Sequence, residues 1–283
     1  MAESAQASLG SVVSLWRYPV KSMMGEELNA ADVSEFGLLG DRAYAIIDRS
    51  DGKVATAKNP RKWPRLFDFR ASLVDGLVRI TLPDGSIVSG DDPALDEILS
   101  KAIGRDVTFA AADRTRRDTD TSEEFWLDLK EFEHQNTVTE FNLPEGTFFD
   151  AAVVHVLTTS TLDRLRSAYP QGRFEARRFR PNIVVQAASD AADFPENGWV
   201  GRTISIGDEV QLNVTAPCSR CVMTTLAQGD LPNDPGILRA AAKHNAANVG
   251  VYASVIRAGR VRRGDAVALQ EDADAQQPLQ SFA

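Results

Sequence analysis

Two cysteines carry the most distinctive chemistry in this sequence. Cys218 and Cys221 are the only cysteines in 283 residues, and they form a Cys-Ser-Arg-Cys motif. Cysteines at this spacing are typical of half a zinc site, of a redox-active dithiol, or of a thiolate that binds another soft metal centre. A fourth possibility is that both are buried and chemically inert, as many free cysteines are. Each alternative places a different demand on the rest of the chain.

The sequence lacks a suitably spaced pair of further ligands for a structural zinc site. Such a site needs four protein ligands, and no two of the histidines His134, His155 and His244 have the usual three- to five-residue spacing. A thioredoxin-like dithiol is also disfavoured, because the motif follows the strand-like residues 209–214 rather than opening a helix. A single thiolate beside Arg220 remains the favoured interpretation, since a neighbouring positive charge promotes the metal-binding form of a thiol.

The composition is typical of an ordinary globular protein. Hydrophobic residues make up 43% and charged residues 25% of a chain long enough for one large or two medium domains. The net charge of −9, without a basic run, argues against a nucleic-acid-binding surface. Residues 1–6 lack signal-peptide features, and no apolar run is long enough to span a membrane. With so few cysteines, we expect a cytoplasmic protein that does not bind membranes.

The first part of the chain has the pattern of strands and turns, with one helix. Strands are predicted over residues 11–20, 41–48, 67–74 and 77–82, with Asp75 and Gly76 as a hairpin turn between the last two. A helix is predicted over residues 93–103, because Pro93 suits its first position and Gly104 its end. The charged run of residues 113–131 is typical of a solvated linker. We therefore predict domains over residues 1–115 and 116–270, followed by a flexible acidic tail over 271–283.

The second part mixes strands and helices and contains two conspicuous polar features. His155 stands among aliphatic residues, so we interpret it as a core histidine rather than a catalytic base. Arg177, Arg178 and Arg180 indicate either a solvated surface turn or an anion site. The remaining predicted elements are strands over residues 153–157 and 183–185, a helix over 159–169, a hairpin over 204–210, a helix over 237–243, and a final strand pair over 248–257 and 261–269 with its turn at residue 259. No glycine-rich nucleotide-binding motif is present, so neither a nicotinamide cofactor nor ATP is indicated.

Four motifs in a fixed order resemble the MOSC (molybdenum cofactor sulfurase C-terminal) superfamily. They are Tyr18-Pro19-Val20-Lys21-Ser22, Asp41-Arg42, Phe179-Arg180-Pro181-Asn182, and Cys218-Ser219-Arg220-Cys221 followed by Thr224-Thr225. The sequence is most similar to the branch that includes the mitochondrial amidoxime-reducing components and their bacterial relatives. The resemblance covers residues 11–269. It implies a mainly β fold of the α+β class with a few helices, in which an N-terminal MOSC β-barrel domain, residues 1–115, precedes a MOSC domain, residues 116–270.

The resemblance also implies a binding site for the molybdenum cofactor, Mo-molybdopterin. The second cysteine of the motif, Cys221, matches the family's molybdenum ligand, and Cys218 is then its neighbour. The positions that match the site of the cofactor's phosphate are Lys21, Ser22, Arg42 and Arg180. The positions that match the surroundings of the pterin and the metal are Asn182, Ser219, Arg220 and Tyr252, with Asp150 as a further pterin contact.

The implied activity is two-electron reduction of N-hydroxylated compounds such as amidoximes, hydroxylamines and N-hydroxylated bases. Some bacterial relatives carry a [2Fe–2S] domain, which needs four cysteine ligands, whereas this chain has two cysteines. We therefore expect a separate electron donor of the ferredoxin, flavodoxin or cytochrome type. Two alternatives stay open: a cofactor carrier or sulfur-handling module without reductase activity, and a structural or zinc-holding β protein in which the cysteine motif is incidental.

Overall fold

The computed structural model describes residues 7–112, 122–126, 138–142, 147–149, 152–188 and 193–270, with 122–126 and 138–142 described as backbone only. Three expectations from the sequence lie outside these residues: the domain boundary at residues 115 and 116, the tail over 271–283, and the role of Asp150. Within the described part, no helix is long and apolar enough to cross a membrane.

The elements follow one another as a mainly β chain with four α-helices, which confirms the predicted fold class. The strands of the first half are β1 (Ala7–Arg17), β2 (Glu26–Leu28), β3 (Ala30–Ser34), β4 (Gly37–Leu38), β5 (Tyr44–Asp48), β6 (Arg70–Val74), β7 (Leu77–Thr81), β8 (Ile87–Ser89) and β9 (Val107–Ala111), with α1 (Leu95–Ile103) before β9. The rest comprises β10 (Ser122–Trp126), β11 (Val138–Asn142), β12 (Val154–Thr158), α2 (Thr159–Ala168), α3 (Ala176–Phe179), β13 (Ile183–Ala187), β14 (Thr203–Ile206), β15 (Val210–Ser219), α4 (Gly236–Asn245), β16 (Asn248–Arg257), β17 (Gly259–Arg262) and β18 (Ala266–Leu269).

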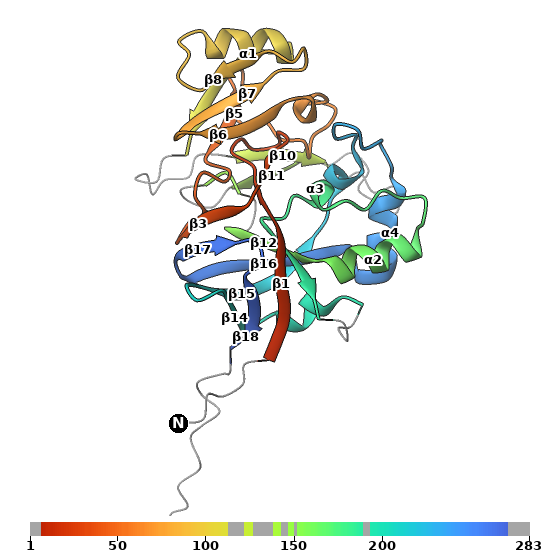
Figure 1. The fold of residues 1–283 in the computed structure, drawn as a ribbon. Coiled ribbons are helices and arrows are strands. Elements are labelled where there is room, and N and C mark those ends of the chain that lie inside the picture. The colour runs from red at the N-terminus through yellow and green to blue at the C-terminus, as the bar shows by residue number, and fades with distance from the viewer. Residues whose placement is uncertain are drawn as a thin grey trace, which may run out of the picture.

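Seven strands close into a barrel, in the order β13, β12, β16, β15, β14, β18 and β1, with β1 pairing back to β13. Strand β1 comes from the start of the chain, so the N-terminal segment completes a barrel that is otherwise built from the second half (Figure 1). Gly10 permits this closure. It has a φ of +138°, and an added Cβ would lie 1.9 Å from the carbonyl oxygen of Gln186 in β13.

Alternate side chains of the barrel strands form its core, as the two-residue period of a strand requires. The buried cluster includes Val12 and Leu15 of β1, Val154 and Val156 of β12, Ile183 and Val185 of β13, Ile204 and Ile206 of β14, Leu212 and Val214 of β15, Val251 and Ala253 of β16, and Val267 and Leu269 of β18. Helices α2 and α4 lie together beside the barrel (Figure 1), and Leu162, Leu165, Ile237 and Ala241 pack between them and the strands.

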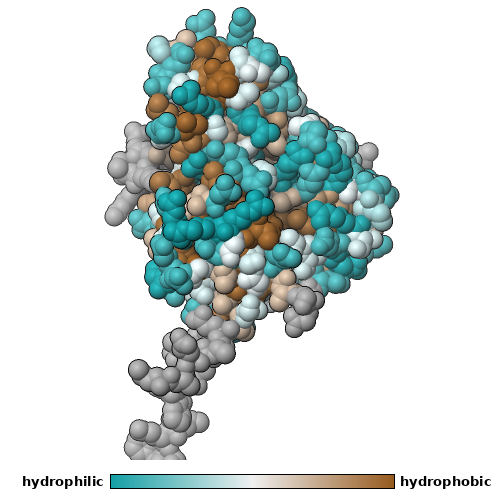
Figure 2. All heavy atoms as spheres, in the orientation of Figure 1, coloured by the Kyte–Doolittle hydropathy of each residue, from teal (hydrophilic) through white to brown (hydrophobic). Residues whose placement is uncertain are grey.

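Strands β5 to β9 and α1 form a second body above the barrel in Figure 1, with its own core around Phe69, Ile80 and Leu99. The hairpin predicted at Asp75 and Gly76 is confirmed, since both residues have the positive φ that a tight turn between β6 and β7 needs. On the face shown in Figure 2, hydrophobic residues are scattered between hydrophilic ones.

Three predictions of secondary structure need correction. The final segments do not form one hairpin: β16 pairs with β12 and β15, whereas β17 joins β3, and Gly259 lies inside β17 rather than in a turn. Residues 122–126 of the charged run form strand β10, which pairs with β11. The strand predicted from residue 41 begins at Tyr44, because the Asp41 carboxylate accepts the backbone N–H of Tyr18 and Arg42 takes a left-handed conformation.

Candidate functional site

A polar pocket lies where the barrel meets the N-terminal body, and residues from both halves of the chain line it. Lys21 and Ser22 follow β1, Arg42 precedes β5, and Arg180 follows α3, while Tyr252 belongs to β16. The other lining residues are Thr56, Lys58, Phe148, Phe149, His155, Phe179, Arg220 and Met223. None of the described lining residues is acidic. The pocket therefore presents converging cations to whatever binds there.

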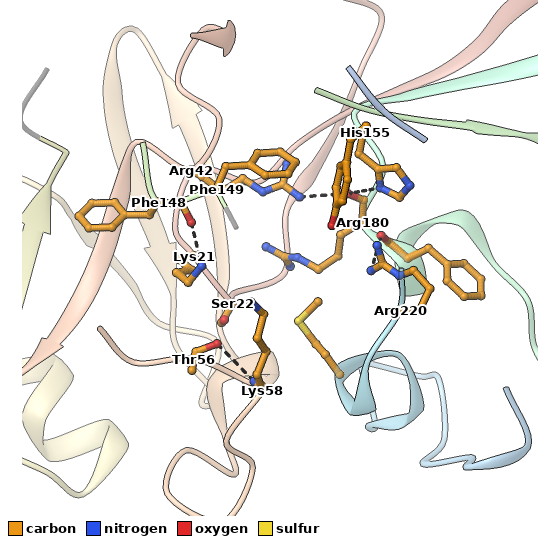
Figure 3. Close-up of a pocket in the computed structure, with 13 residues that line it drawn as sticks. Lys21, Ser22, Arg42, Thr56, Lys58, Phe148, Phe149, His155, Arg180 and Arg220 are labelled. Carbon is orange, nitrogen blue, oxygen red and sulfur yellow. Dashed lines mark hydrogen bonds between the residues drawn. The ribbon is translucent and has the colours of Figure 1, made fainter. Parts of the chain in front are cut away.

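Backbone carbonyl groups fix the direction of these cations. Lys21 Nζ donates to the carbonyl of Phe148 at 2.8 Å, and Arg42 Nη2 donates to the carbonyl of Arg180 at 3.0 Å. Arg220 Nη2 donates to the carbonyl of Phe179 at 3.0 Å. Figure 3 shows Arg180 in the middle of the group, with Lys21, Ser22 and Lys58 on one side and His155 and Arg220 on the other. Carbonyl oxygens are neutral acceptors, so these bonds orient the cations without cancelling their charge.

Three of the lining residues hold an unusual backbone conformation. Ser22, Arg42 and Arg180 have φ values of 62°, 44° and 55°, in the left-handed region that residues with a Cβ rarely adopt. This conformation costs about 1–2 kcal/mol per residue and is found where surrounding contacts over-determine it, often at functional sites. Ser22 Oγ accepts the backbone N–H of Ala57 at 3.0 Å, which is one such contact. Three of the six non-glycine residues with a positive φ in the described part of the chain therefore line the pocket.

Aromatic rings accompany the two central arginines. The guanidinium carbon of Arg42 lies 4.6 Å from the ring centre of Tyr18 and 4.2 Å from that of Phe149. The guanidinium carbon of Arg180 lies 4.2 Å from the Tyr18 ring centre and 5.9 Å from that of Phe67. All four distances are within the range of a cation–π interaction, which is strongest where water is excluded.

The cysteine motif joins the end of β15 to a short 3₁₀ helix, Val222–Thr225, which begins directly after Cys221. Cys218 is fully buried, and Nη1 of Arg220 lies 2.6 Å from its sulfur. Cys221 is half-buried and packs with a small apolar cluster that includes Met24, Ala57, Phe67 and Met223. Among the described residues, no group of three His, Cys, Asp or Glu side chains could hold a metal ion.

Arg220 is the charged residue between the two cysteines in the sequence. Burial opposes its charged form, but the nearby Cys218, Tyr252 and Cys221, which are negative when ionised, outweigh this effect and raise the pKa of Arg220. Its Nε atom is buried and has no hydrogen-bond partner in the part of the chain that the structure describes. Arg220 therefore stays positive and keeps one donor unused among those residues.

His155 is a buried histidine with nearby hydrogen-bond acceptors, as expected from the sequence, and it also lines the pocket. Its Nε2 lies 3.0 Å from the carbonyl oxygen of Val249, and its Nδ1 lies 3.5 Å from that of Arg180. Burial, with a smaller contribution from Arg220, lowers the pKa of His155 to about 3. A neutral imidazole has a single N–H, which the nearer Val249 carbonyl accepts.

Arg177, Arg178 and Arg180 have three different surroundings. Their sequence pattern alone predicts one environment for all three, either a solvated surface turn or an anion site. Arg180 lines the pocket. Arg177 pairs with Glu175 and Asp230 near the surface. Arg178 is fully buried and belongs to neither expected class, because it donates to the backbone carbonyls of Arg173, Thr224, Leu226 and Pro232 at 3.0 to 3.1 Å. It holds the 3₁₀ helix after Cys221 and the following loop against α3.

The structure brings six of the predicted cofactor residues to the pocket lining: Lys21, Ser22, Arg42, Arg180, Arg220 and Tyr252. Two others have different neighbours in the described residues. The Asn182 side chain is buried, accepts the backbone N–H of His155 at 3.0 Å and donates to the Trp16 carbonyl at 3.4 Å, so it ties β12 to β1. Ser219 Oγ donates to the Asn248 side chain at 2.9 Å. Cys221 stands next to Arg220 and packs against the lining residue Met223.

Other lining residues were missed by the sequence interpretation. Thr56 and Lys58 belong to the loop after β5, and their nearest sequence signal is the Asn59-Pro60 turn. Phe148 and Phe149 precede β12 and offer a carbonyl to Lys21 and a ring to Arg42. Such roles depend on tertiary contacts and leave no local pattern in the sequence.

Comparisons with known proteins agree with this arrangement. Residues 9–128 match the MOSC N-terminal beta barrel domain, and residues 144–268 match the MOSC domain. Mitochondrial amidoxime-reducing component 1 from Mus musculus is 26% identical over 237 residues, 77% of this chain and 66% of that protein. Mitochondrial amidoxime reducing component 2 from Bos taurus is 27% identical over 245 residues, 77% of this chain and 67% of that protein.

Matches with these relatives thus span about two thirds of their own length. Among solved structures, the YUAD protein from Bacillus subtilis is 12% identical, with a TM-score of 0.47 over 92% of this chain and 94% of that one. The two domain matches together account for most of the chain and follow each other in the order that the motifs predict. The chain therefore belongs to the MOSC family, in the arrangement where a MOSC N-terminal beta barrel domain precedes a MOSC domain.

Proposed function

We propose that this chain binds the molybdenum cofactor in the pocket and reduces N-hydroxylated compounds by two electrons. The observation that carries the proposal is the meeting of six family-matched residues, from segments more than 200 positions apart in the chain, around one pocket beside Cys221. The distant relationship to the amidoxime-reducing components supports the same assignment.

The residues present fit such a cofactor. Lys21, Arg42 and Arg180 supply fixed donors that match the oxygens of a phosphate, which arginine forks bind well. The buried Nε of Arg220 has no hydrogen-bond partner among the described residues and would find one on a bound anion. Cys221 adds the soft sulfur ligand that a molybdenum centre prefers. These cationic donors and the Cys221 thiolate together suit an anionic cofactor that carries a thiophilic metal.

Each residue then has a distinct task. Lys21, Ser22, Arg42 and Arg180 would hold the phosphate, and Arg220 and Tyr252 would lie near the pterin and the metal. Cys221 would hold the molybdenum, with Arg220 favouring the thiolate form of this cysteine. When bound, the cofactor would supply the reduction in which an N–OH group, two electrons and two protons yield N–H and water.

Electrons would come from a separate donor of the ferredoxin, flavodoxin or cytochrome type. The small substrate would be an amidoxime, a hydroxylamine or an N-hydroxylated base. A carrier of the cofactor would share the binding residues but would not turn over such substrates.

The test is reduction of a simple amidoxime by the cofactor-loaded chain, with a reduced viologen dye as the artificial donor. We expect amidine formation that consumes two electrons per product. Bound cofactor without turnover would instead support the carrier function, and the Cys221→Ala variant provides the inactive control.

A further inference from the structure

Tyr18 is a buried aromatic residue that contacts the pocket arginines without lining the pocket itself. It is 1% exposed and follows the end of β1, three residues before Lys21. Gly25 leaves room for the ring, because an added Cβ there would lie 2.5 Å from it. Tyr18 opens the Tyr-Pro-Val-Lys-Ser motif, but it is not among the residues that match the family's cofactor site.

Three links connect Tyr18 to Arg42. The backbone N–H of Tyr18 donates to Asp41 Oδ1 at 2.7 Å, and the Asp41 carboxylate in turn pairs with the Arg42 guanidinium. The carbonyl of Tyr18 accepts the backbone N–H of Arg42 at 2.8 Å, which supports the left-handed conformation of that residue. The ring centre of Tyr18 lies 4.6 Å from the Arg42 guanidinium carbon.

The same ring also contacts Arg180, whose guanidinium carbon lies 4.2 Å from its centre. Tyr18 is thus the one aromatic residue that both buried arginines share in the described part of the chain. Two like charges repel each other. The Asp41 carboxylate offsets part of that repulsion through its pair with Arg42, and the negative face of the Tyr18 ring offsets a further part where water is excluded. The Arg42 side chain also donates to the backbone carbonyl of Arg180 at 3.0 Å, so it is tied to the backbone of the residue whose side chain shares the ring.

The ring and the hydroxyl of Tyr18 differ in their contacts. The hydroxyl oxygen is buried and has no hydrogen-bond partner among the residues that the structure describes. Burial raises the pKa of Tyr18 although Arg180, Arg42 and Arg220 oppose this effect, so the side chain stays a neutral phenol. Its contribution to the two arginines therefore comes from the π face and not from a phenolate charge.

We propose that Tyr18 is a positioning residue whose ring holds Arg42 and Arg180 in the orientation that binds one phosphate group. The inference rests on the proposed function for the identity of that group as part of the molybdenum cofactor. Arg42 and Arg180 can bind a phosphate whether or not it belongs to the molybdenum cofactor. An experiment with inorganic phosphate therefore tests the role of Tyr18 separately from the identity of the cofactor.

The experiment is calorimetric titration of inorganic phosphate into the full-length, cofactor-free chain at low ionic strength. The variants are Tyr18→Phe, which keeps the ring, and Tyr18→Leu, which removes it. We expect Tyr18→Phe to bind phosphate within about twofold of the original chain and Tyr18→Leu to bind at least about tenfold more weakly, because two desolvated cation–π contacts are lost. Thermal unfolding of each variant without phosphate records any general loss of stability separately.

Two further variants make the outcomes distinguishable. Arg180→Gln should lose phosphate binding, and Tyr169→Leu, at the end of α2, should keep it. Equal binding by Tyr18→Leu and the original chain, with loss in Arg180→Gln, would overturn the inference alone. Equal loss in Tyr18→Phe and Tyr18→Leu would overturn it by assigning the effect to the hydroxyl. If the original chain binds phosphate no better than Arg180→Gln, both the inference and the proposed cofactor site fail.

Discussion

Nη1 of Arg220 lies 2.6 Å from the sulfur of Cys218, the cysteine that family resemblance places beside the metal ligand rather than at the metal. Cys218 is fully buried, whereas Cys221 is half-buried beside the pocket. The two cysteines of one motif thus have different surroundings. One contacts the arginine that lines the pocket, and the other remains accessible to a ligand.

This difference predicts unequal effects of substituting the two cysteines. Cys221→Ala should abolish molybdenum retention and amidoxime reduction, because the sulfur ligand is lost. Cys218→Ala should keep measurable cofactor and activity but lower the free energy of unfolding by about 1–3 kcal/mol, because a buried hydrogen-bonding partner of Arg220 is removed. Metal analysis and urea unfolding of both variants test this. Equal loss of metal in the two would contradict a single-cysteine ligand.

Arg178 is predicted to be essential for stability, although it lies outside the pocket. Arg178→Met would leave four backbone carbonyls without their donor and should lower the free energy of unfolding by about 3 kcal/mol or more. The adjacent Arg177→Met removes only ion pairs near the surface and should cost about 1 kcal/mol or less. Denaturant unfolding of the two variants gives the comparison, and similar costs would show that the carbonyl contacts of Arg178 contribute little.

Because His155 is buried in its neutral form, we expect the free energy of unfolding to decrease at acidic pH. Its pKa is lowered from 6.5 to about 3 in the folded protein. Between these values the unfolded chain binds a proton that the folded chain does not, so stability falls as the pH is lowered through this window. The contribution of His155 is up to about 1.4 kcal/mol per pH unit. Urea unfolding at pH 7, 6 and 5 should show a shallower decline for His155→Gln, and an unchanged slope would mean that the imidazole is not held neutral.

The ends of α4 and α1 provide a reciprocal pair of substitutions. Ala246 ends α4 with a φ of 48°, where glycine is the usual residue, and Gly104 ends α1 with a φ of 80°. Ala246→Gly should raise the free energy of unfolding by about 0.5–1 kcal/mol, because the strain of a left-handed alanine exceeds the added flexibility of glycine. Gly104→Ala, whose added Cβ meets open space, should lower it by a similar amount. Chemical unfolding of both variants tests the pair, and changes of the same sign would refute the backbone argument.

Local pattern was enough to predict much of the fold. Runs of β-branched and aromatic residues predicted several barrel strands, including the strand over residues 11–20 and the hairpin over 204–210. Thr158 gives α2 the N-terminal cap that such helices favour, since its hydroxyl accepts the backbone N–H of Thr161. Local pattern could not predict which strands pair when they are distant in the sequence. Nothing near β1 specifies that it lies between β13 and β18, and nothing near β17 specifies that it joins β3.

In the candidate site, too, local sequence does not specify the tertiary contacts of single residues. Arg178 and Arg180 are two positions apart, with similar sequence surroundings, yet one binds backbone carbonyls in the interior and the other faces the pocket. The left-handed conformation of Arg180 turns its side chain away from the direction of its neighbours. Motif resemblance named Arg180 as a site residue, but the partners of Arg178 come from loops about fifty residues later.

The molybdenum and pterin content of the chain, after production in a host that synthesises the cofactor, tests the proposed cofactor site most directly. A site with a single thiolate ligand predicts about one molybdenum and one pterin per chain. It also predicts loss of the metal in Cys221→Ala and loss of both in Arg180→Gln, with Arg177→Met as a loaded control. Zinc in place of molybdenum, or equal loading of all four proteins, would contradict it.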